Sequence, residues 1–218
     1  MKEDLSRWIA SLRRDVPESQ LEESDVAPNP IDQFGAWMQE AIDAGLTFPN
    51  AMALATASAE GVPSARIVLL KGIDERGLVF FTNYESRKGR ELAENPRAAA
   101  LFHWQQLGRQ VRVEGEVVGL PAEESEAYFR TRPRGSRLAA WASRQSEVIT
   151  SRRVLEKRFA ELSLSYEEQD IPLPPFWGGY LLRPRVIELW QARRDRLHDR
   201  LRYRKDEEGS WMVERLAP

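Results

Sequence analysis

Apolar residues near the N-terminus of the chain recur at helical spacing. They predict an amphipathic helix that ends before Pro17 and whose apolar face docks on another surface. The apolar positions are Leu5, Trp8, Ile9 and Leu12. The following stretch, Ser19 to Pro30, is acidic, poor in apolar residues and ends in Pro-Asn-Pro, a composition typical of a mobile linker. We therefore expect residues 1–29 to form a helix and linker that can move as a lid, and residues 30–218 to form the main domain.

A second helix is predicted to begin at Pro30, with Asn29 as its N-terminal cap and Gly45 as its end. One apolar stripe along this helix is expected to lie in the core. The stripe consists of Ile31, Phe34, Trp37, Met38, Ala41 and Ile42.

From Ala51 onward the apolar residues alternate with a period of two, which predicts short strands separated by turns such as Glu60-Gly61 and Arg76-Gly77. The predicted strands cover 51–58, 63–71, 78–82, 98–104, 110–120, 180–190, 201–205 and 211–216. Helical spacing returns at 86–94, 121–131 and 151–164. This order predicts an α+β fold with a closed antiparallel sheet and flanking helices, not a doubly wound parallel sheet.

Composition narrows the function classes. The 218 residues are 42% hydrophobic, which excludes disorder along the whole length, and 32 basic residues nearly balance 34 acidic ones. Bulk charge therefore gives no general attraction to nucleic acid or to an anionic membrane, and any basic site must be local. The absence of cysteine excludes a disulfide or thiolate nucleophile, and the two histidines, His103 and His198, are too few for a usual zinc site, so no metal is expected. Without a signal-peptide core or an apolar membrane span, a cytoplasmic location is the simplest expectation.

The stretch from Pro63 to Lys71 predicts a buried strand with one cation near each end, Arg66 and Lys71. Residues five apart in a regular strand face opposite ways, so these two cations would serve different groups unless a bulge re-aims one of them. The alternative is a core strand with solvated charged ends.

A first candidate for anion binding runs from Thr82 to Arg90. It follows a strand and opens a helix at Ser86, so free backbone N–H groups, a hydroxyl and the cations of Arg87 and Lys88 can meet at a helix N-terminus. This arrangement favours a phosphate. The alternative is a capped surface helix with solvated cations.

A second candidate combines Tyr128 and Arg132, which lie four apart on one helical face. Pro133 is expected to break the helix, so that Ser136 can turn back toward them. A phenol, a guanidinium and a hydroxyl suit a second phosphate, although such spacing also occurs in ordinary surface pairs. Gln145-Ser146 follows shortly and offers further polar groups.

The third candidate extends from Trp190 to Arg200. If this segment is extended, Arg196, His198 and Arg200 project to one side, with Leu197 and Leu201 on the other. Two guanidinium groups about 7 Å apart repel by roughly 2 kcal/mol at an effective dielectric constant near 20, so an anionic ligand or neighbouring carboxylates should neutralise them. A solvated basic ribbon and a nucleic-acid patch are alternatives, and the balanced total charge argues against the second.

Taken together, the order and spacing of these stretches resemble the pyridoxamine 5′-phosphate oxidase family over almost the whole chain. The matching stretches are Arg66-Ile-Val-Leu-Leu-Lys71, Phe81-Thr-Asn, Ser86-Arg-Lys88, Arg109-Gln-Val, Tyr128 with Arg132-Pro-Arg and Ser136, Gln145-Ser146, Pro172-Leu-Pro with Phe176-Trp-Gly-Gly179, Trp190 with Arg196-Leu-His-Asp-Arg200, and the closing Glu214-Arg-Leu-Ala-Pro218.

The resemblance implies an FMN-binding split β-barrel and a homodimer with FMN at the subunit interface. It implies oxidation of pyridoxamine or pyridoxine 5′-phosphate to pyridoxal 5′-phosphate, with oxygen reoxidising the flavin to give hydrogen peroxide. The implied FMN-binding residues are Arg66, Ile67, Val68, Leu69, Leu70, Lys71, Phe81, Thr82, Arg87, Lys88, Gln110, Gln145, Ser146, Trp190 and Arg200. The implied substrate-binding residues are Arg13, Lys71, Tyr128, Arg132, Ser136, Arg196, Leu197 and His198.

Within that implied site, Arg196 and His198 would frame the pyridine ring against the flavin as catalytic positioning residues. Arg13 matches a substrate-covering arginine of the family, but Val16 stands where some members carry a tyrosine. Two alternatives remain: a split-barrel flavoprotein with a different substrate, and a nucleic-acid-binding protein without flavin.

Overall fold

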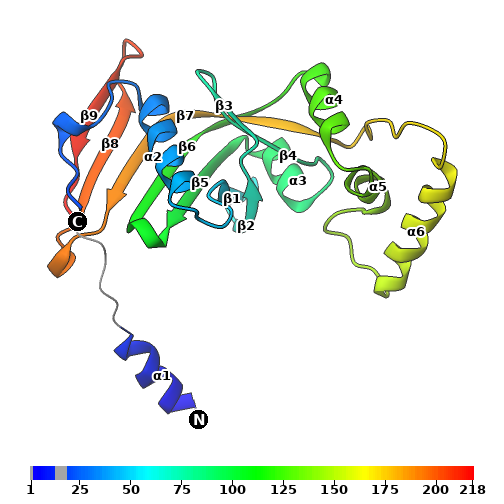
Figure 1. Cartoon of the computed structure of the whole chain (residues 1–218), viewed down its shortest axis with the longest axis horizontal. Coiled ribbons are helices and arrows are strands. Elements are labelled where there is room, and N and C mark those ends of the chain that lie inside the picture. The colour runs from blue at the N-terminus through cyan, green and yellow to red at the C-terminus, as the bar shows by residue number, and fades with distance from the viewer. Residues whose placement is uncertain (1, 13–18) are drawn as a thin grey trace.

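The computed structural model describes residues 2–12 and 19–218, with the backbone alone for Lys2 and Glu3. Within these residues an antiparallel sheet is flanked by helices (Figure 1). The helices are α1 (Lys2–Ser11), η1 (Glu23–Asp25), α2 (Pro30–Asp43), α3 (Arg87–Glu94), η2 (Gln105–Leu107), α4 (Ala122–Thr131), α5 (Arg134–Ala142), α6 (Arg152–Ser165) and η3 (Arg194–Arg196). The strands are β1 (Ala51–Ala57), β2 (Pro63–Leu69), β3 (Gly72–Asp74), β4 (Gly77–Asn83), β5 (Arg97–Trp104), β6 (Arg109–Gly119), β7 (Trp177–Gln191), β8 (Asp199–Lys205) and β9 (Trp211–Arg215).

The main sheet runs in the order β2-β1-β5-β6-β7-β4-β3, and β8 and β9 extend it from β7. All of the pairings are antiparallel, which confirms the predicted antiparallel sheet with flanking helices. The path is open, with β2 and β3 as its ends, but Leu70 and Lys71 join these two strands directly. The Lys71 N–H donates to the Val79 carbonyl oxygen at 2.8 Å, which brings the end of β2 against β4.

The main core lies between the sheet and α2. The Asn29 side chain caps α2 by accepting a hydrogen bond from the Ile31 N–H at 2.9 Å, as predicted. Phe34 and Ala41 are fully buried, whereas Ile42 is 50% exposed, so the buried stripe is narrower than the apolar pattern indicates. A second, smaller core forms around Phe129, Leu138, Ile171 and Trp177, where α4 and α5 meet β7.

The prediction of a buried strand at 63–71 is wrong. β2 lies at the edge of the sheet path and pairs only with β1 among the described strands. None of its residues is buried, and Ile67 is 66% exposed. The apolar run at 67–70 is typical of a strand that is buried on both faces, but the sequence alone does not show whether other elements cover those faces.

The acidic segment that follows residue 18 packs against the sheet, in place of the mobile linker that its composition indicates. Leu21 is 4% exposed, and its N–H donates to Asp199 Oδ2 at 3.2 Å. Arg215 of β9 pairs with the carboxylates of Glu22 and Glu23 at 2.9 and 2.7 Å. By contrast, the apolar residues Trp8 and Ile9 of α1 are 60% and 55% exposed.

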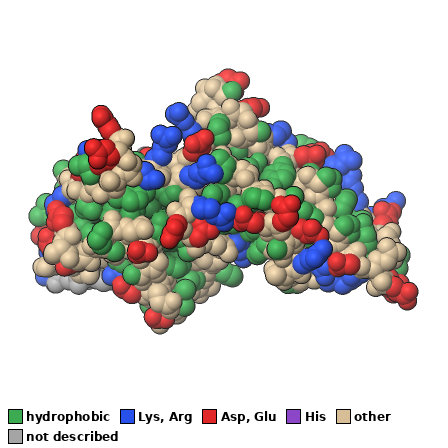
Figure 2. Space-filling model, turned by 90° about the horizontal axis from the view of Figure 1, so that it is seen from above, with side chains coloured by type: hydrophobic (Ala, Val, Ile, Leu, Met, Phe, Trp, Pro, Cys, Tyr) green, Lys and Arg blue, Asp and Glu red, His purple; other side chains and the backbone are tan. Residues whose placement is uncertain are grey.

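Two further features concern the surface. On the face seen in Figure 2, basic and acidic side chains are interspersed, in keeping with the balanced composition. None of the helices in the described part of the chain has the length and apolar character needed to cross a membrane.

Candidate functional site

A pocket of about 710 Å³ opens between β2, β4 and the helices α3, α4 and α5. Its size lies within the range of small-molecule and cofactor sites. The lining includes the predicted cofactor residues Arg66, Ile67, Val68, Leu69, Lys71, Phe81, Thr82, Arg87, Lys88, Gln145 and Ser146, together with Tyr128 and Arg132. The chain thus brings the first two candidate clusters to one cavity.

The start of α3 forms one end of this pocket. Ser86 caps the helix, since its Oγ accepts a hydrogen bond from the Gly89 N–H at 3.3 Å. Position 89 requires glycine, because a Cβ there would lie 2.0 Å from the Tyr84 carbonyl oxygen. The N-terminus of α3 therefore lies at the pocket, where the partial positive charge of the helix dipole favours an anion.

Lys88 is the most enclosed cation of the pocket, with 8% of its surface exposed. Its Nζ donates to Thr82 Oγ1 and to Gln145 Oε1, both at 3.0 Å. Burial, together with the nearby Arg66, lowers the pKa of Lys88 to about 8. Because these partners are neutral, the ammonium has no counter-ion among the described residues and can pair with a bound anion.

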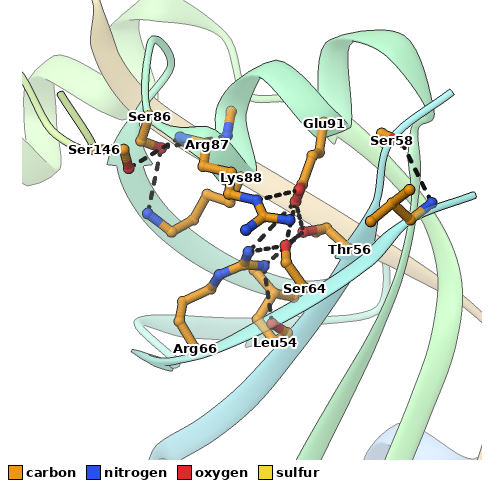
Figure 3. Close-up of polar contacts among 12 residues, drawn as sticks. Leu54, Thr56, Ser58, Ser64, Arg66, Ser86, Arg87, Lys88, Glu91 and Ser146 are labelled. Carbon is orange, nitrogen blue, oxygen red and sulfur yellow. Dashed lines mark hydrogen bonds and ion pairs between the residues drawn. The ribbon is translucent and has the colours of Figure 1, made fainter. Parts of the chain in front are cut away.

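Arg66 and Arg87 converge on the same side of the pocket (Figure 3). Arg66 Nη1 donates to the Leu54 carbonyl oxygen at 3.1 Å and to Thr56 Oγ1 at 2.6 Å. Arg87 Nε pairs with Glu91 Oε1 at 2.8 Å, and the Arg87 N–H donates to Ser146 Oγ at 3.1 Å. Arg66 and Lys71 line the same cavity although they lie five positions apart, because β2 ends at Leu69 before Lys71.

A second cationic group lies in the same pocket, beside a stack of aromatic rings. The rings of Phe81 and Tyr128 stack with their centroids 3.9 Å apart, and Trp177 continues the stack at 5.5 Å from Phe81. The Arg132 guanidinium lies over Trp177, 4.6 Å from the ring centroid. Arg132 Nη1 is buried and has no hydrogen-bond partner among the described residues, and burial lowers the pKa of this side chain. A buried charged donor without a partner is costly, which points to an anionic ligand at this position.

Leu70 and Ser136 were predicted for this site but do not line the pocket. Leu70 is 7% exposed and belongs to the core. Ser136 lies in the first turn of α5, because Pro133 is the N-terminal cap of a new helix rather than only the end of α4. Among the described residues, Ser136 makes no hydrogen bond to Tyr128 or Arg132, so the expected turn of Ser136 toward them is not observed. Arg13 and Val16 lie outside the described residues.

The remaining predicted residues gather at the other end of β7. Trp190 is in register with Gln110 of β6 and with Arg200 of β8. The rings of Trp190 and His198 lie 4.5 Å apart. Glu188 is 5% exposed and orients Arg200 by accepting from its Nε at 2.8 Å.

His198 is held as a neutral imidazole. Its Nδ1 accepts a hydrogen bond from the Arg193 N–H at 3.1 Å, which leaves the ring proton on Nε2. Burial and the neighbouring Arg196 lower the pKa of His198, and Asp199 opposes them. The Nε2–H is thus available as a donor at neutral pH.

The sequence places Arg196, His198 and Arg200 on one side only if their segment is extended, and the start of this segment is not extended. Arg194–Arg196 is a 3₁₀ turn, and β8 begins only at Asp199. Asp195 and Arg196 have φ values of 55° and 62°, an uncommon conformation that costs free energy and is found often at functional sites. Leu197 is 68% exposed, so it does not pack with the buried Leu201.

Within one chain, the pocket lies far from the Trp190 group, which consists of Trp190, Arg196, His198 and Arg200. Trp177 lines the pocket, and Trp190 follows thirteen residues later on the same strand. At about 3.3 Å per residue, this corresponds to about 40 Å along β7. Figure 1 shows β7 crossing from the side of α4 to the side of β8. A small ligand that contacts Trp177 therefore does not reach Trp190 of the same chain.

Several pocket residues were not found by sequence reasoning. Trp177 and Asn83 belong to quoted stretches but carry no site prediction, and Ser64 and Ser143 have no distinctive spacing. Glu91 does not line the pocket, but it contacts the lining residues Arg66 and Arg87. Its position four residues after Arg87 is the one signal that could have identified it.

Comparisons with known proteins agree with one another. A family model described as pyridoxamine 5′-phosphate oxidase matches residues 38–166, and one described as the pyridoxine 5′-phosphate oxidase C-terminal dimerisation region matches residues 177–218. A pyridoxine/pyridoxamine 5′-phosphate oxidase of Paraburkholderia phytofirmans is 58% identical over 96% of this chain and 99% of its own length. One from Rubrobacter xylanophilus is 57% identical over the full length of both chains. The crystal structure of PhzG from Burkholderia lata 383, in complex with tetrahydrophenazine-1-carboxylic acid, is 36% identical, with a TM-score of 0.87 over 93% of this chain and 99% of that one.

Proposed function

The chain belongs to the pyridoxamine 5′-phosphate oxidase family, and from this premise we propose that it oxidises pyridoxamine and pyridoxine 5′-phosphates to pyridoxal 5′-phosphate with FMN as cofactor. One observation carries the proposal: a single pocket presents two separate groups of cations. Arg66, Arg87 and Lys88 suit the phosphate of FMN, and Arg132 suits the phosphate of the substrate.

The donor set fits FMN by its chemistry. Among the described residues, Lys88 Nζ donates only to neutral oxygens, and the N-terminus of α3 adds the partial positive charge of its helix dipole. When bound, FMN supplies hydride acceptance and passes the electrons to oxygen, with hydrogen peroxide as the product. The residues of the chain contribute binding and orientation. Arg132 fixes the substrate phosphate, and the Phe81–Tyr128–Trp177 stack gives a rigid wall beside it.

We further propose that the working enzyme is a homodimer in which the Trp190 group of one chain completes the pocket of the other. The match to a C-terminal dimerisation region supports this arrangement, as does the separation of about 40 Å along β7. In such a dimer, Arg196 and the Nε2–H of His198 would orient the pyridine ring for reaction. Holding the reacting carbon in a near-attack geometry can lower the barrier by several kcal/mol.

A visible absorption spectrum together with an oxidase assay tests the proposed function. The purified protein should be yellow or should take up added FMN, and it should form pyridoxal 5′-phosphate and hydrogen peroxide from pyridoxine 5′-phosphate. A colourless protein that does not take up FMN would contradict the proposal and favour a non-flavin function such as nucleic-acid binding.

A flavoprotein with a different substrate is the second candidate, favoured by the similarity to PhzG with its bound tetrahydrophenazine-1-carboxylic acid. A carboxylate of this kind carries less charge than a phosphate dianion, and the buried, unpartnered Nη1 of Arg132 suits the dianion better. Competition between the two ligands on the FMN-loaded protein distinguishes the candidates. The proposed function requires the pyridoxine 5′-phosphate to bind more tightly.

The pKa of Lys88 leads to a prediction for cofactor affinity. Since the pKa of Lys88 is about 8 in the free site, the ammonium loses its proton as the pH rises above 8. A phosphate dianion binds the protonated form, so FMN affinity should fall by up to about tenfold per pH unit above pH 8. Fluorescence titrations of the flavin-free protein between pH 7 and 9.5 measure this loss.

Lys88→Arg is the matched variant for this prediction, because a guanidinium stays protonated throughout that range. Its FMN affinity should be nearly independent of pH. A wild-type affinity that stays constant up to pH 9.5 would contradict the role given to Lys88.

A further inference from the structure

Glu91 is a buried carboxylate directly beneath the cations of the pocket. It lies on α3 and is 5% exposed. Its Oε2 accepts hydrogen bonds from Thr56 Oγ1 at 2.5 Å and from Ser64 Oγ at 2.6 Å. Burial raises the pKa of Glu91, but these hydroxyls and Arg87 outweigh burial and lower it to about 2. The side chain is therefore a fixed negative charge at neutral pH.

Two of the pocket arginines, Arg66 and Arg87, contact this carboxylate. Arg87 Nε contacts Glu91 Oε1 at 2.8 Å, although the Arg87 side chain is 56% exposed and would otherwise be free to turn into solvent. Arg66 Nη2 lies 3.4 Å from Oε2 and also donates to Ser64 Oγ, while its Nη1 donates to Thr56 Oγ1. In Figure 3 the side chains of Arg66 and Arg87 both reach toward the Glu91 carboxylate.

The charges of the site also point to this role. Arg66, Arg87 and Lys88 supply three positive charges, and Glu91 removes one of them. The remaining two match the charge of a phosphate monoester, which is about −1.5 to −2 at neutral pH. A carboxylate so near an anion site would by Coulomb's law alone weaken the binding of phosphate, so its presence must be offset by what it does to the arginines.

We infer that Glu91 is a positioning residue that holds Arg66 and Arg87 ready for the phosphate of the flavin cofactor. The inference rests on the proposed function, since it takes FMN as the ligand of this pocket. It predicts a loss of affinity when the negative charge is removed, which is opposite in sign to the effect of charge repulsion alone.

The test compares FMN with riboflavin, which has the same ring and ribityl chain but no phosphate. Both are titrated into the flavin-free full-length protein, and the ratio of the dissociation constant for riboflavin to that for FMN reports the contribution of the phosphate. In Glu91→Gln this ratio should fall about tenfold, while the affinity for riboflavin changes little. Glu94→Gln is the matched control, because Glu94 is an exposed glutamate on the same helix, and it should leave the ratio unchanged.

Each other outcome has a defined meaning. An unchanged or larger ratio in Glu91→Gln would overturn the inference, and so would an equal loss of affinity for both flavins, which indicates damage to the fold. If Glu91→Gln does not fold, Ser64→Ala removes one hydroxyl that holds the carboxylate. Its ratio should fall by a smaller factor, and an unchanged ratio there would equally overturn the inference. Failure of the wild-type protein to bind FMN would instead contradict the proposed function.

Discussion

Two inactive variants of this chain should regain activity when they are combined in one dimer. The first carries Arg87→Ala and Lys88→Ala and loses the FMN phosphate contacts of the pocket. The second carries Arg196→Ala and His198→Ala and loses the group beside Trp190. If each site takes its pocket from one chain and its Trp190 group from the other, the mixed dimer has one intact site and one doubly damaged site. Its activity per dimer should be about half that of the wild type.

The measurement uses two affinity tags to isolate the mixed dimer, light scattering to verify its mass, and the rate of pyridoxal 5′-phosphate formation. The control combines Arg196→Ala in one chain with His198→Ala in the other. Both sites of that dimer carry one change, so activity should not rise above that of the parent variants. If the first mixed dimer is also as inactive as its parents, the site does not combine residues of two chains.

Local patterns predicted most of the fold of this chain. Strand 98–104 was predicted from its period of two and is observed as Arg97–Trp104, and the cap at Asn29 begins α2 as expected. The errors lie where tertiary context decides. The helix before Pro133 ends as predicted, but the helix α5 that follows this proline directly was not predicted, although proline also suits a helix start. Likewise, Ile67 was expected in the core because the sequence does not show that β2 is an edge strand.

The site was predictable where its chemistry is local. The Ser86-Arg87-Lys88 run is a helix start with cations, and in the structure Ser86 caps α3 while Arg87 and Lys88 line the pocket. Glu91 was missed, since its partners Thr56 and Ser64 come from β1 and β2 and only the folded chain brings them together. The separation of the Trp190 group from the pocket was also invisible in the sequence, because it depends on β7 being one unbroken strand.

Arg132→Ala should produce the largest loss of substrate affinity of any single change in the pocket. The guanidinium is held over Trp177 at 4.6 Å and has a buried Nη1 that lacks a partner among the described residues, so its side chain is in place before the substrate arrives. Charge-assisted hydrogen bonds to a phosphate contribute about 1.5–3 kcal/mol each, and a guanidinium can form two of them. We expect kcat/KM for pyridoxine 5′-phosphate to fall by a factor on the order of a hundred or more, mainly through KM.

The same variant should keep its FMN, because Arg66, Arg87 and Lys88 bind at the other end of the pocket. Arg130→Ala provides the matched control: Arg130 lies two residues earlier, and its exposed side chain pairs with Glu126 at 2.5 Å on the surface. Steady-state kinetics and bound-flavin content are measured on the same preparations, with pyridoxine lacking the phosphate as a second substrate. If Arg132 binds the phosphate, Arg132→Ala should lose activity toward pyridoxine 5′-phosphate alone. Its activity toward pyridoxine should not change, because pyridoxine has no phosphate for Arg132 to bind. An Arg132→Ala enzyme that released its FMN, yet bound substrate normally once reconstituted, would place Arg132 with the cofactor instead.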